Sequence, residues 1–343
     1  MNTRKLGWTD LYLTEIGFGA WAIGGGDWAF GWGPQDDEDS IAAIRRALEL
    51  GVNWIDTAAI YGLGHSEEVV AKAIAGMRDK VIIATKCTSP WNEKREVSHS
   101  LRKASILAEC EGSLKRLNTD HIDLYQLHRV ATEDTVEEAW EAMALLVEQG
   151  KVRYGGVSNV LPADMDRCRI VSPTSIEGGE KGGVGSAVRI ASLQPPYSMM
   201  RRAVESLHYP YCEAHEIGVV AYSPMQAGLL TGKFDRSKVA ATDWRSRSPE
   251  FNEPNLAVNL DFVEKLRLIA NGYQKTVAQL ALAWTLRLSV VTSAIAGART
   301  PKQIEETVGG AGWKISDDDL KTIDGLLAWR LEECKRVGGG ARG

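Results

Sequence analysis

Short apolar runs with β-strand character alternate eight times with longer runs of helical periodicity along the chain. The expected strands are Ile16–Gly19, Asn53–Asp56, Val81–Thr85, Ile122–Leu127, Tyr154–Ser158, Ser192–Gln194, Val219–Tyr222 and Ser293–Ala296. They are apolar without strict alternation, which is typical of parallel strands that are buried on both faces. Eight successive strand–helix units favour a closed (β/α)8 TIM barrel, in the α/β class, over an open sheet.

The segments between these strands have the three- and four-residue spacing of apolar side chains that predicts helices. The expected helices are Asp37–Leu50, Ser66–Ala75, Lys103–Leu117, Val136–Gln149, Ala163–Ile170, Ala203–His215, Asp261–Ala270, Val277–Leu288 and Pro301–Val308. Two further elements lie outside the repeat. Arg4–Leu6 and Leu11–Ile16 predict an N-terminal β-hairpin, and Asp317–Ala328 predicts an extra C-terminal helix that begins after Ser316.

The length of 343 residues fits one such barrel, so we expect a single domain over residues 1–343. The glycine-rich residues 172–191 predict a flexible insertion, and residues 335–343 predict a disordered tail. A second long connection, residues 226–259, follows the seventh strand. Loops of this length at the strand-exit face of a barrel usually carry function.

Composition and charge exclude several classes of function. The formal net charge of −5 does not favour binding to nucleic acid or to an anionic membrane. Five widely spaced cysteines favour reduced thiols in the cytoplasm over a disulfide framework. The chain has neither the apolar segment of a signal peptide nor a membrane span, and its histidines and cysteines lack metal-ligand spacing. We therefore expect a cytoplasmic protein with no bound metal and a small-molecule partner, and we leave its oligomeric state open.

Polar side chains follow three successive strands at the point where each strand ends. Asp56 ends the second strand, Lys86 the third and His128 the fourth, and Tyr61 lies in the loop after Asp56. In a parallel barrel these positions share one rim and point toward the axis. Each residue has an ordinary alternative: Asp56 as a helix cap, Tyr61 in loop packing, Lys86 in solvent and His128 in the core. Their coincidence on successive units favours a catalytic site.

These four groups suit the reduction of a carbonyl. Negative charge grows on the carbonyl oxygen as hydride reaches the carbon, so a proton donor is needed there. Tyrosine has an ordinary pKa of about 10, and we expect the Lys86 ammonium to lower the pKa of Tyr61. Asp56 would keep Lys86 charged, and His128 would orient the substrate oxygen. No side chain donates hydride, so a cofactor must supply it.

Several stretches together resemble the aldo-keto reductase superfamily. They are Gly51–Glu67, Ala84–Lys86, Leu114–Leu117, Asp123–His128, Lys151–Asn159, Gln194–Tyr197, Ala221–Lys233 and Gly297–Gln303. The likeness is strongest to bacterial general-purpose aldo-keto reductases, near the branch that includes potassium-channel β subunits. It implies that Asp56, Tyr61, Lys86 and His128 form the catalytic tetrad, with Tyr61 as the general acid.

The resemblance also implies where an extended nicotinamide dinucleotide would bind on the barrel rim. The implied cofactor residues are Ser158, Asn159 and Gln194 at the carboxamide, Tyr222 against the nicotinamide ring, Ser223, Pro224, Gln226, Gly228, Leu229, Thr231 and Lys233 around the pyrophosphate, and Gly297, Arg299, Gln303 and Glu306 toward the adenosine. A guanidinium suits a 2′-phosphate, so Arg299 favours NADPH over NADH.

Tryptophans in the loops after the first and third strands are candidates for the substrate pocket. They are Trp21, Trp28, Trp32 and Trp91, and their alternative role is ordinary loop packing. An aromatic-lined pocket would suit an apolar aldehyde or ketone.

The sequence thus predicts NADPH-dependent reduction of aldehydes and ketones to alcohols. Two alternatives stay open. One is a regulatory or binding module that resembles the potassium-channel β subunits, which can retain the tetrad. The other is a lyase that forms a Schiff base through Lys86, although the neighbouring Asp56 would hold that lysine protonated.

Overall fold

The eight parallel strands of this computed structural model form a closed barrel, which confirms the predicted fold class. The structure describes residues 1–26, 31–130, 134–171, 189–241 and 243–338. Around the barrel the strands follow one another in chain order and β10 closes on β3. The strands are β3 (Ile16–Gly19), β4 (Trp54–Asp56), β5 (Ile82–Cys87), β6 (Ile122–Leu127), β7 (Val152–Ser158), β8 (Ser192–Gln194), β9 (Gly218–Ala221) and β10 (Val291–Gly297).

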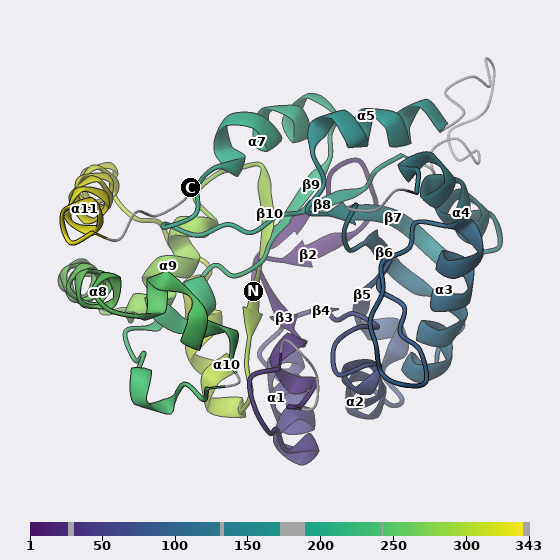
Figure 1. The fold of residues 1–343 in the computed structure, drawn as a ribbon, viewed down its shortest axis with the longest axis horizontal. Coiled ribbons are helices and arrows are strands. Elements are labelled where there is room, and N and C mark those ends of the chain that lie inside the picture. Colours follow the sequence, from purple (N-terminus) through teal and green to yellow (C-terminus); the bar gives the residue numbers. More distant parts are fainter. Residues whose placement is uncertain (27–30, 131–133, 172–188, 242, 339–343) are drawn as a thin grey trace.

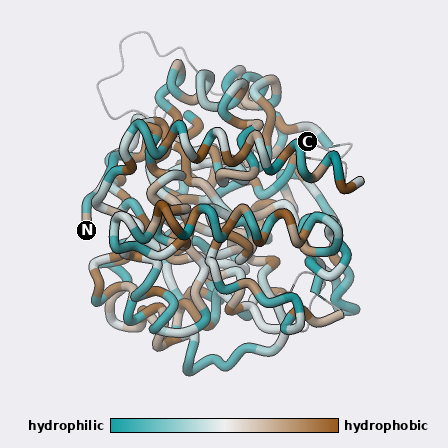
Figure 2. The backbone as a smooth tube through the Cα atoms, turned by 90° about the vertical axis from the view of Figure 1, so that its left-hand side faces the viewer, coloured by the Kyte–Doolittle hydropathy of each residue, from teal (hydrophilic) through white to brown (hydrophobic). Residues whose placement is uncertain are grey.

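Helices surround the barrel on its outer face (Figure 1). They are α1 (Asp37–Glu49), α2 (His65–Ala73), α3 (Lys103–Leu117), α4 (Val136–Glu148), α5 (Pro162–Val171), α7 (Val204–Ala214), α8 (Asn255–Gly272), α9 (Val277–Thr285), α10 (Pro301–Thr307) and α11 (Asp317–Arg336). Hydrophobic and hydrophilic stretches alternate along the helices on the side that carries α8 and α11 (Figure 2), as expected for helices with one face toward the core.

The C-terminal helix is longer than the sequence-based expectation. Helix α11 ends at Arg336, two residues into the segment that we predicted as a tail, because Lys335 and Arg336 form ion pairs with Glu332 and Glu333 on the same helix. Residues 339–343 lie outside the described residues, as do residues 172–188 of the predicted insertion.

The predicted hairpin closes one end of the barrel. Its strands are β1 (Thr3–Lys5) and β2 (Tyr12–Thr14), and they pair antiparallel. The turn side chains Leu6 and Leu11 are buried against Trp54 and Leu124, which project into the barrel from β4 and β6. The hairpin therefore covers the bottom of the barrel and excludes solvent from that end.

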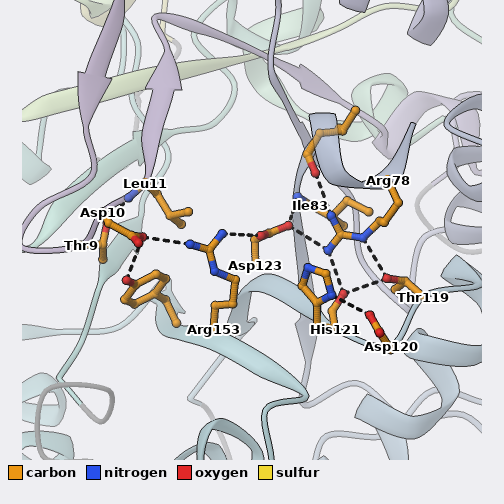
Figure 3. A network of polar contacts seen from close by, with 12 residues as sticks. Thr9, Asp10, Leu11, Arg78, Ile83, Thr119, Asp120, His121, Asp123 and Arg153 are labelled. Atoms are coloured by element: carbon orange, nitrogen blue, oxygen red, sulfur yellow. Dashed lines mark hydrogen bonds and ion pairs between the residues drawn. The ribbon is translucent and has the colours of Figure 1, made fainter. Parts of the chain in front are cut away.

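A chain of charged groups fixes the hairpin to the strands (Figure 3). Arg153 of β7 donates to Asp10 in the hairpin turn over 3.0 Å and to Asp123 of β6 over 2.8 Å. Asp123 also accepts from Arg78 Nη2 over 2.9 Å and from the backbone N–H of Ile83 over 2.9 Å. This network lies at the N-terminal end of the strands, where residues of a barrel usually serve stability.

Alternation along the strands divides the barrel interior into an apolar lower part and a polar upper part. Trp54 and Asp56 share the inward face of β4, since successive side chains point to opposite faces. Ala84 and Lys86 do the same on β5. Trp54 and Ala84, which lie nearer the hairpin, belong to one apolar cluster. The upper members are buried acid and ammonium groups, so this is the end of the barrel where chemistry is built.

Candidate active site

The structure brings the four predicted catalytic residues together at the upper rim. Lys86 Nζ lies 2.7 Å from Asp56 Oδ2 and 3.1 Å from Tyr61 Oη, and both acceptors come from β4 and the loop after it. The rings of Tyr61 and His128 meet edge to face with centroids 5.8 Å apart. Residues far apart in the sequence thus converge because their strands are neighbours in the barrel.

Three acceptors surround the Lys86 ammonium. Besides Asp56 and Tyr61, the carbonyl oxygen of Thr57 accepts from Nζ over 2.8 Å. An ammonium has three N–H donors and no acceptor, so these bonds use all of them. Burial lowers the pKa of Lys86, but Asp56 and then Tyr61 outweigh burial and raise that pKa above its usual value. Lys86 is therefore a fixed cation.

Tyr61 differs from the sequence-based expectation. We predicted that Lys86 would lower the pKa of the Tyr61 phenol, yet this pKa is raised above its ordinary value. Burial is the largest cause, and the opposing effect of the Lys86 charge is smaller. The phenol is 9% exposed, so water stabilises its anion poorly. Tyr61 consequently remains protonated at neutral pH.

His128 is the neutral member of the group. Burial lowers its pKa well below the usual value, and the charge of Lys86 and then of Arg129 acts in the same direction. Its imidazole is therefore uncharged at physiological pH and has one N–H donor. The backbone N–H of His128 donates to the carbonyl oxygen of Cys87 over 3.2 Å, which ties the ends of β5 and β6 together.

A second row of polar side chains continues from this group across β7, β8 and β9. Gln194 Nε2 donates to Asp56 Oδ1 over 2.8 Å, and Ser158 Oγ donates to the carbonyl oxygen of Gln194 over 2.9 Å. Tyr222 Oη donates to Asn159 Oδ1 over 2.9 Å. Four of the predicted cofactor residues therefore adjoin the tetrad, although Tyr222 lies one residue beyond the end of β9.

The loop after β9 has an unusual backbone. Ser223, Gln226 and Ala227 have φ of +56°, +47° and +50°, a left-handed region that non-glycine residues seldom adopt. Gly228 follows with φ of +96°. Strained backbone of this kind gathers at ligand sites, and successive left-handed residues direct N–H groups toward anions.

Two side chains of that loop are engaged by other parts of the protein. The Gln226 amide accepts from Ser198 Oγ over 2.6 Å and donates to Glu250 Oε2 over 2.8 Å, so both its ends are held by the protein. Leu229 is fully buried beside Phe251. These two residues can reach a cofactor only through their backbone. Pro224 is buried, and Thr231 Oγ1 donates to the carbonyl oxygen of Gly228 over 2.6 Å.

Guanidinium and ammonium groups line the far end of the rim. Burial and then the Arg245 charge lower the pKa of Arg299. Arg245 is itself paired with Asp243, at 2.6 Å, and donates to the Ala227 carbonyl oxygen over 3.1 Å. Lys233 Nζ lies 2.5 Å from Glu306 Oε2, so these two predicted residues pair with each other. The Arg299 guanidinium, which pairs with no carboxylate among the described residues, fits a phosphate group.

Arg299 is held in place by the predicted Gln303 and by Gln35 and Pro34, which sequence reasoning did not single out. Its Nε donates to Gln35 Oε1 and its Nη2 to the carbonyl oxygen of Pro34, and the backbone N–H of Arg299 donates to Gln303 Oε1 over 2.7 Å. Gly297 is exposed at the end of β10. No motif marks Gln35 in the sequence. Arg245 could have been suspected, because it lies in the long connection after the seventh strand.

Aromatic rings adjoin Tyr61. Trp21 stacks on Tyr61 with centroids 6.3 Å apart, and Trp91 packs in the same apolar cluster. Trp32 lies next to Trp21, with the Arg245 guanidinium 4.4 Å from its ring centroid. Trp28 lies outside the described residues. Three of the four candidate tryptophans thus form one wall.

Over the described part of the chain, no three His, Cys, Asp or Glu side chains are placed to hold a metal ion. No helix within the same residues is long and apolar enough to cross a membrane. The five cysteines all lie in this part, are buried and form no disulfide.

Comparison with known proteins identifies the family of the chain. Residues 15–328 match the Aldo/keto reductase family. The chain belongs to that family. The aldo-keto reductase YhdN of Bacillus subtilis (strain 168) is 38% identical over 331 residues, which span 95% of this chain and 94% of that protein. The NADH-specific methylglyoxal reductase of Escherichia coli (strain K12) is 34% identical, over 97% of this chain and all of that protein.

A solved aldo-keto reductase structure also superimposes on the whole chain. It is the glycerol dehydrogenase of Gluconobacter oxydans, with a TM-score of 0.84 and 34% identity, covering 100% of this chain and 98% of the other. Membership of the aldo/keto reductase family makes this chain an oxidoreductase, and such reductases use nicotinamide cofactors.

Proposed function

We propose that this aldo-keto reductase reduces aldehydes and ketones to alcohols with NADPH. The observation that carries the proposal is the hydrogen bond of 3.1 Å between Lys86 and Tyr61. Because an ammonium can only donate, the phenol oxygen is the acceptor and its own hydrogen points away from Lys86. That hydrogen is the proton that a developing alkoxide needs.

Each residue of the tetrad then has one task. A nicotinamide cofactor held on the rim would supply the hydride to the carbonyl carbon. Tyr61 gives its proton to the carbonyl oxygen, and the fixed Lys86 cation stabilises the phenolate that remains. Asp56 keeps Lys86 charged and in place. The neutral His128 donates a hydrogen bond to the same substrate oxygen and orients it.

The cofactor would lie along the rim from Asn159 to Arg299. Asn159, with Ser158 and Gln194 behind it, would hold the carboxamide, and Tyr222 would cover the nicotinamide ring. The backbone of residues 223–229 would receive the pyrophosphate. Trp21, Trp32 and Trp91 would face the substrate, which favours apolar carbonyl compounds.

NADPH is the preferred cofactor in this proposal because the Arg299 guanidinium lies at the proposed adenosine end, whereas Arg245 is paired with Asp243. A 2′-phosphate adds charge that Arg299 can bind, whereas the hydroxyl of NADH offers none. The related reductase of Escherichia coli is specific for NADH, so the preference depends on these local residues and not on the family.

The Schiff-base alternative conflicts with the surroundings of Lys86. A nucleophilic amine needs a lone pair, but Asp56, Thr57 and Tyr61 occupy all three hydrogens of an ammonium whose pKa is raised. The remaining alternative, a regulatory module that binds cofactor without turnover, needs no acid at this position. The phenol hydrogen directed away from Lys86 favours the enzyme.

A carbonyl panel tests the function. The purified chain is assayed for NADPH and NADH oxidation with 4-nitrobenzaldehyde, methylglyoxal and a larger ketone. The proposal predicts turnover of at least the aromatic aldehyde and a higher kcat/KM with NADPH. Tight NADPH binding without turnover of any carbonyl would favour the regulatory module instead.

A further inference from the structure

The turn that follows Lys86 is strained. Thr88, two residues after Lys86, has φ of +76°, which is rare for any β-branched residue. Its side chain is buried, with 1% exposure. Such a conformation persists only when neighbouring groups hold it, and it is commonly found where a site needs fixed geometry.

The strained turn holds the segment that carries His128. Thr88 Oγ1 donates to the carbonyl oxygen of Arg129 over 3.2 Å and accepts from the Arg129 N–H over 3.2 Å. The His128 N–H donates to the carbonyl oxygen of Cys87 over 3.2 Å. The backbone on both sides of His128 is therefore bonded to residues 87 and 88.

One carboxylate holds the turn itself. Glu109, on α3, accepts from the Thr88 N–H at Oε1 over 3.2 Å and from the Ser89 N–H at Oε2 over 3.1 Å. Each oxygen of the carboxylate thus satisfies one amide of the turn. In the described part of the chain no hydrogen bond or ion pair joins Glu109 to the tetrad, so any effect on chemistry passes through the turn.

We propose that Glu109 is a positioning residue that fixes His128 through the Thr88–Ser89 turn, and that it does so only as a carboxylate. This inference rests on the proposed reductase function. Protonation converts one oxygen of Glu109 from an acceptor into a donor, so it loses one of the two amide bonds. The turn and His128 then lose the alignment that a substrate oxygen requires, and small misplacements lower turnover strongly.

The pKa of Glu109 makes its positioning role testable by varying the pH. Burial raises the pKa of Glu109 to about 7, against the lowering effect of the Ser89 and Thr88 amides, Ser105 and Arg116. Burial places the pKa of Cys87 on β5 and of Tyr125 on β6 well above their usual values, so both stay neutral.

The other ionisable groups around α3 include two ion pairs and a histidine that contacts the turn. Arg116 is paired with Glu67 of α2, and Lys103 lies within ion-pair distance of Glu141 of α4. His99 Nδ1 lies 3.3 Å from the carbonyl oxygen of Thr88, so a variant at His99 serves as the control for Glu109.

The test compares the pH dependence of kcat in the full chain and in three variants. Wild-type kcat for NADPH-dependent reduction should fall about tenfold from about pH 8 to about pH 5.5, with an apparent pKa near 7. Glu109→Gln keeps one acceptor and cannot ionise. Its kcat at about pH 8 should be about tenfold lower and independent of pH, with an unchanged Kd for NADPH.

The control is His99→Gln, which should keep the acid limb. Thr88→Val removes the bonds to Arg129 and leaves the volume of the side chain, so its kcat should also fall about tenfold at unchanged KM. An acid limb that persists in Glu109→Gln overturns the inference, as does full kcat in Thr88→Val. If the Gln variant does not fold, the Thr88→Val result decides. A wild-type chain that reduces no carbonyl at any pH would refute the proposed function and not this inference alone.

Discussion

Lys86 Nζ donates a hydrogen bond of 3.1 Å to Tyr61 Oη, and the phenol is nevertheless held in its protonated form because it is buried. The two effects of the site on Tyr61 oppose each other. The lysine favours the anion, while the lack of water disfavours it more strongly. Lys86 therefore acts mainly after proton transfer, when it stabilises the new phenolate.

The alkaline limb of the pH–rate profile follows from this balance. Tyr61 is the acid, so reduction needs its protonated form, and the raised pKa preserves that form as pH increases. We expect kcat/KM for 4-nitrobenzaldehyde to hold through about pH 9 and to fall only above about pH 10. A fall centred near neutral pH, absent in Tyr61→Phe, would mean that Lys86 lowers the pKa of Tyr61 as the sequence first indicated.

Asp56 should be needed for both stability and turnover. Asp56→Asn keeps the shape of the side chain but leaves Lys86 with an uncompensated charge. It also places an amide opposite Gln194 Nε2, which donates to the Asp56 carboxylate in the wild type. Breaking a buried ion pair costs about 3–5 kcal/mol, so the free energy of unfolding should fall by that order. The kcat should fall about 100-fold or more. Urea unfolding and steady-state kinetics measure both, and unchanged values would exclude the pair from the site.

Arg299 should decide between the two cofactors. Arg299→Ala removes a guanidinium that Gln35 and the Pro34 carbonyl oxygen hold at the end of the rim proposed to bind the adenosine. We expect kcat/KM with NADPH to fall about tenfold or more and that with NADH to change less than about twofold. Arg46→Ala, which removes an exposed arginine on α1, is the control and should alter neither. Equal losses with both cofactors would argue against contact with the 2′-phosphate.

Glu109 should also leave a signature in stability. Its pKa is about 7 in the folded protein, above the ordinary value near 4.3. The folded state therefore binds more protons between these values, and the contribution of Glu109 to stability falls as pH rises through that window. Allowing for solvent around this partly exposed carboxyl, the loss should be on the order of 1–2 kcal/mol. The free energy of unfolding is measured with urea at both ends of the window for the wild type and for Glu109→Gln. It should change with pH to different extents in the two proteins, and an identical change would contradict the assignment.

The barrel and the tetrad were predictable because both follow from local patterns. All eight strands were expected within about two residues of their observed bounds, since each is a short apolar run between helical segments. Asp56, Lys86 and His128 stand at the ends of three successive strands, and barrel topology brings such positions together. Because the strands that carry these residues are neighbours in the barrel, no further sequence information was needed to bring the residues together.

What the sequence could not provide is the outcome of competing contacts. It did not indicate that Gln226 would turn inward to Ser198 and Glu250, because the two partners lie 28 and 24 residues away. It also did not indicate that burial would outweigh the Lys86 charge at Tyr61, which depends on the packing around one ring. Gln35, which meets Arg299 across 264 residues, carries no local motif at all.

The most direct test of the central claim is Tyr61→Phe. This change removes only the hydroxyl, so the ring should still pack against Trp21 and the fold should be kept. We predict an NADPH Kd within about twofold of wild type and a kcat for 4-nitrobenzaldehyde lower by about 1000-fold or more. Stopped-flow and equilibrium fluorescence titrations measure both quantities on one preparation. A Tyr61→Phe protein that binds NADPH and turns over at the wild-type rate would contradict the assignment of Tyr61 as the acid.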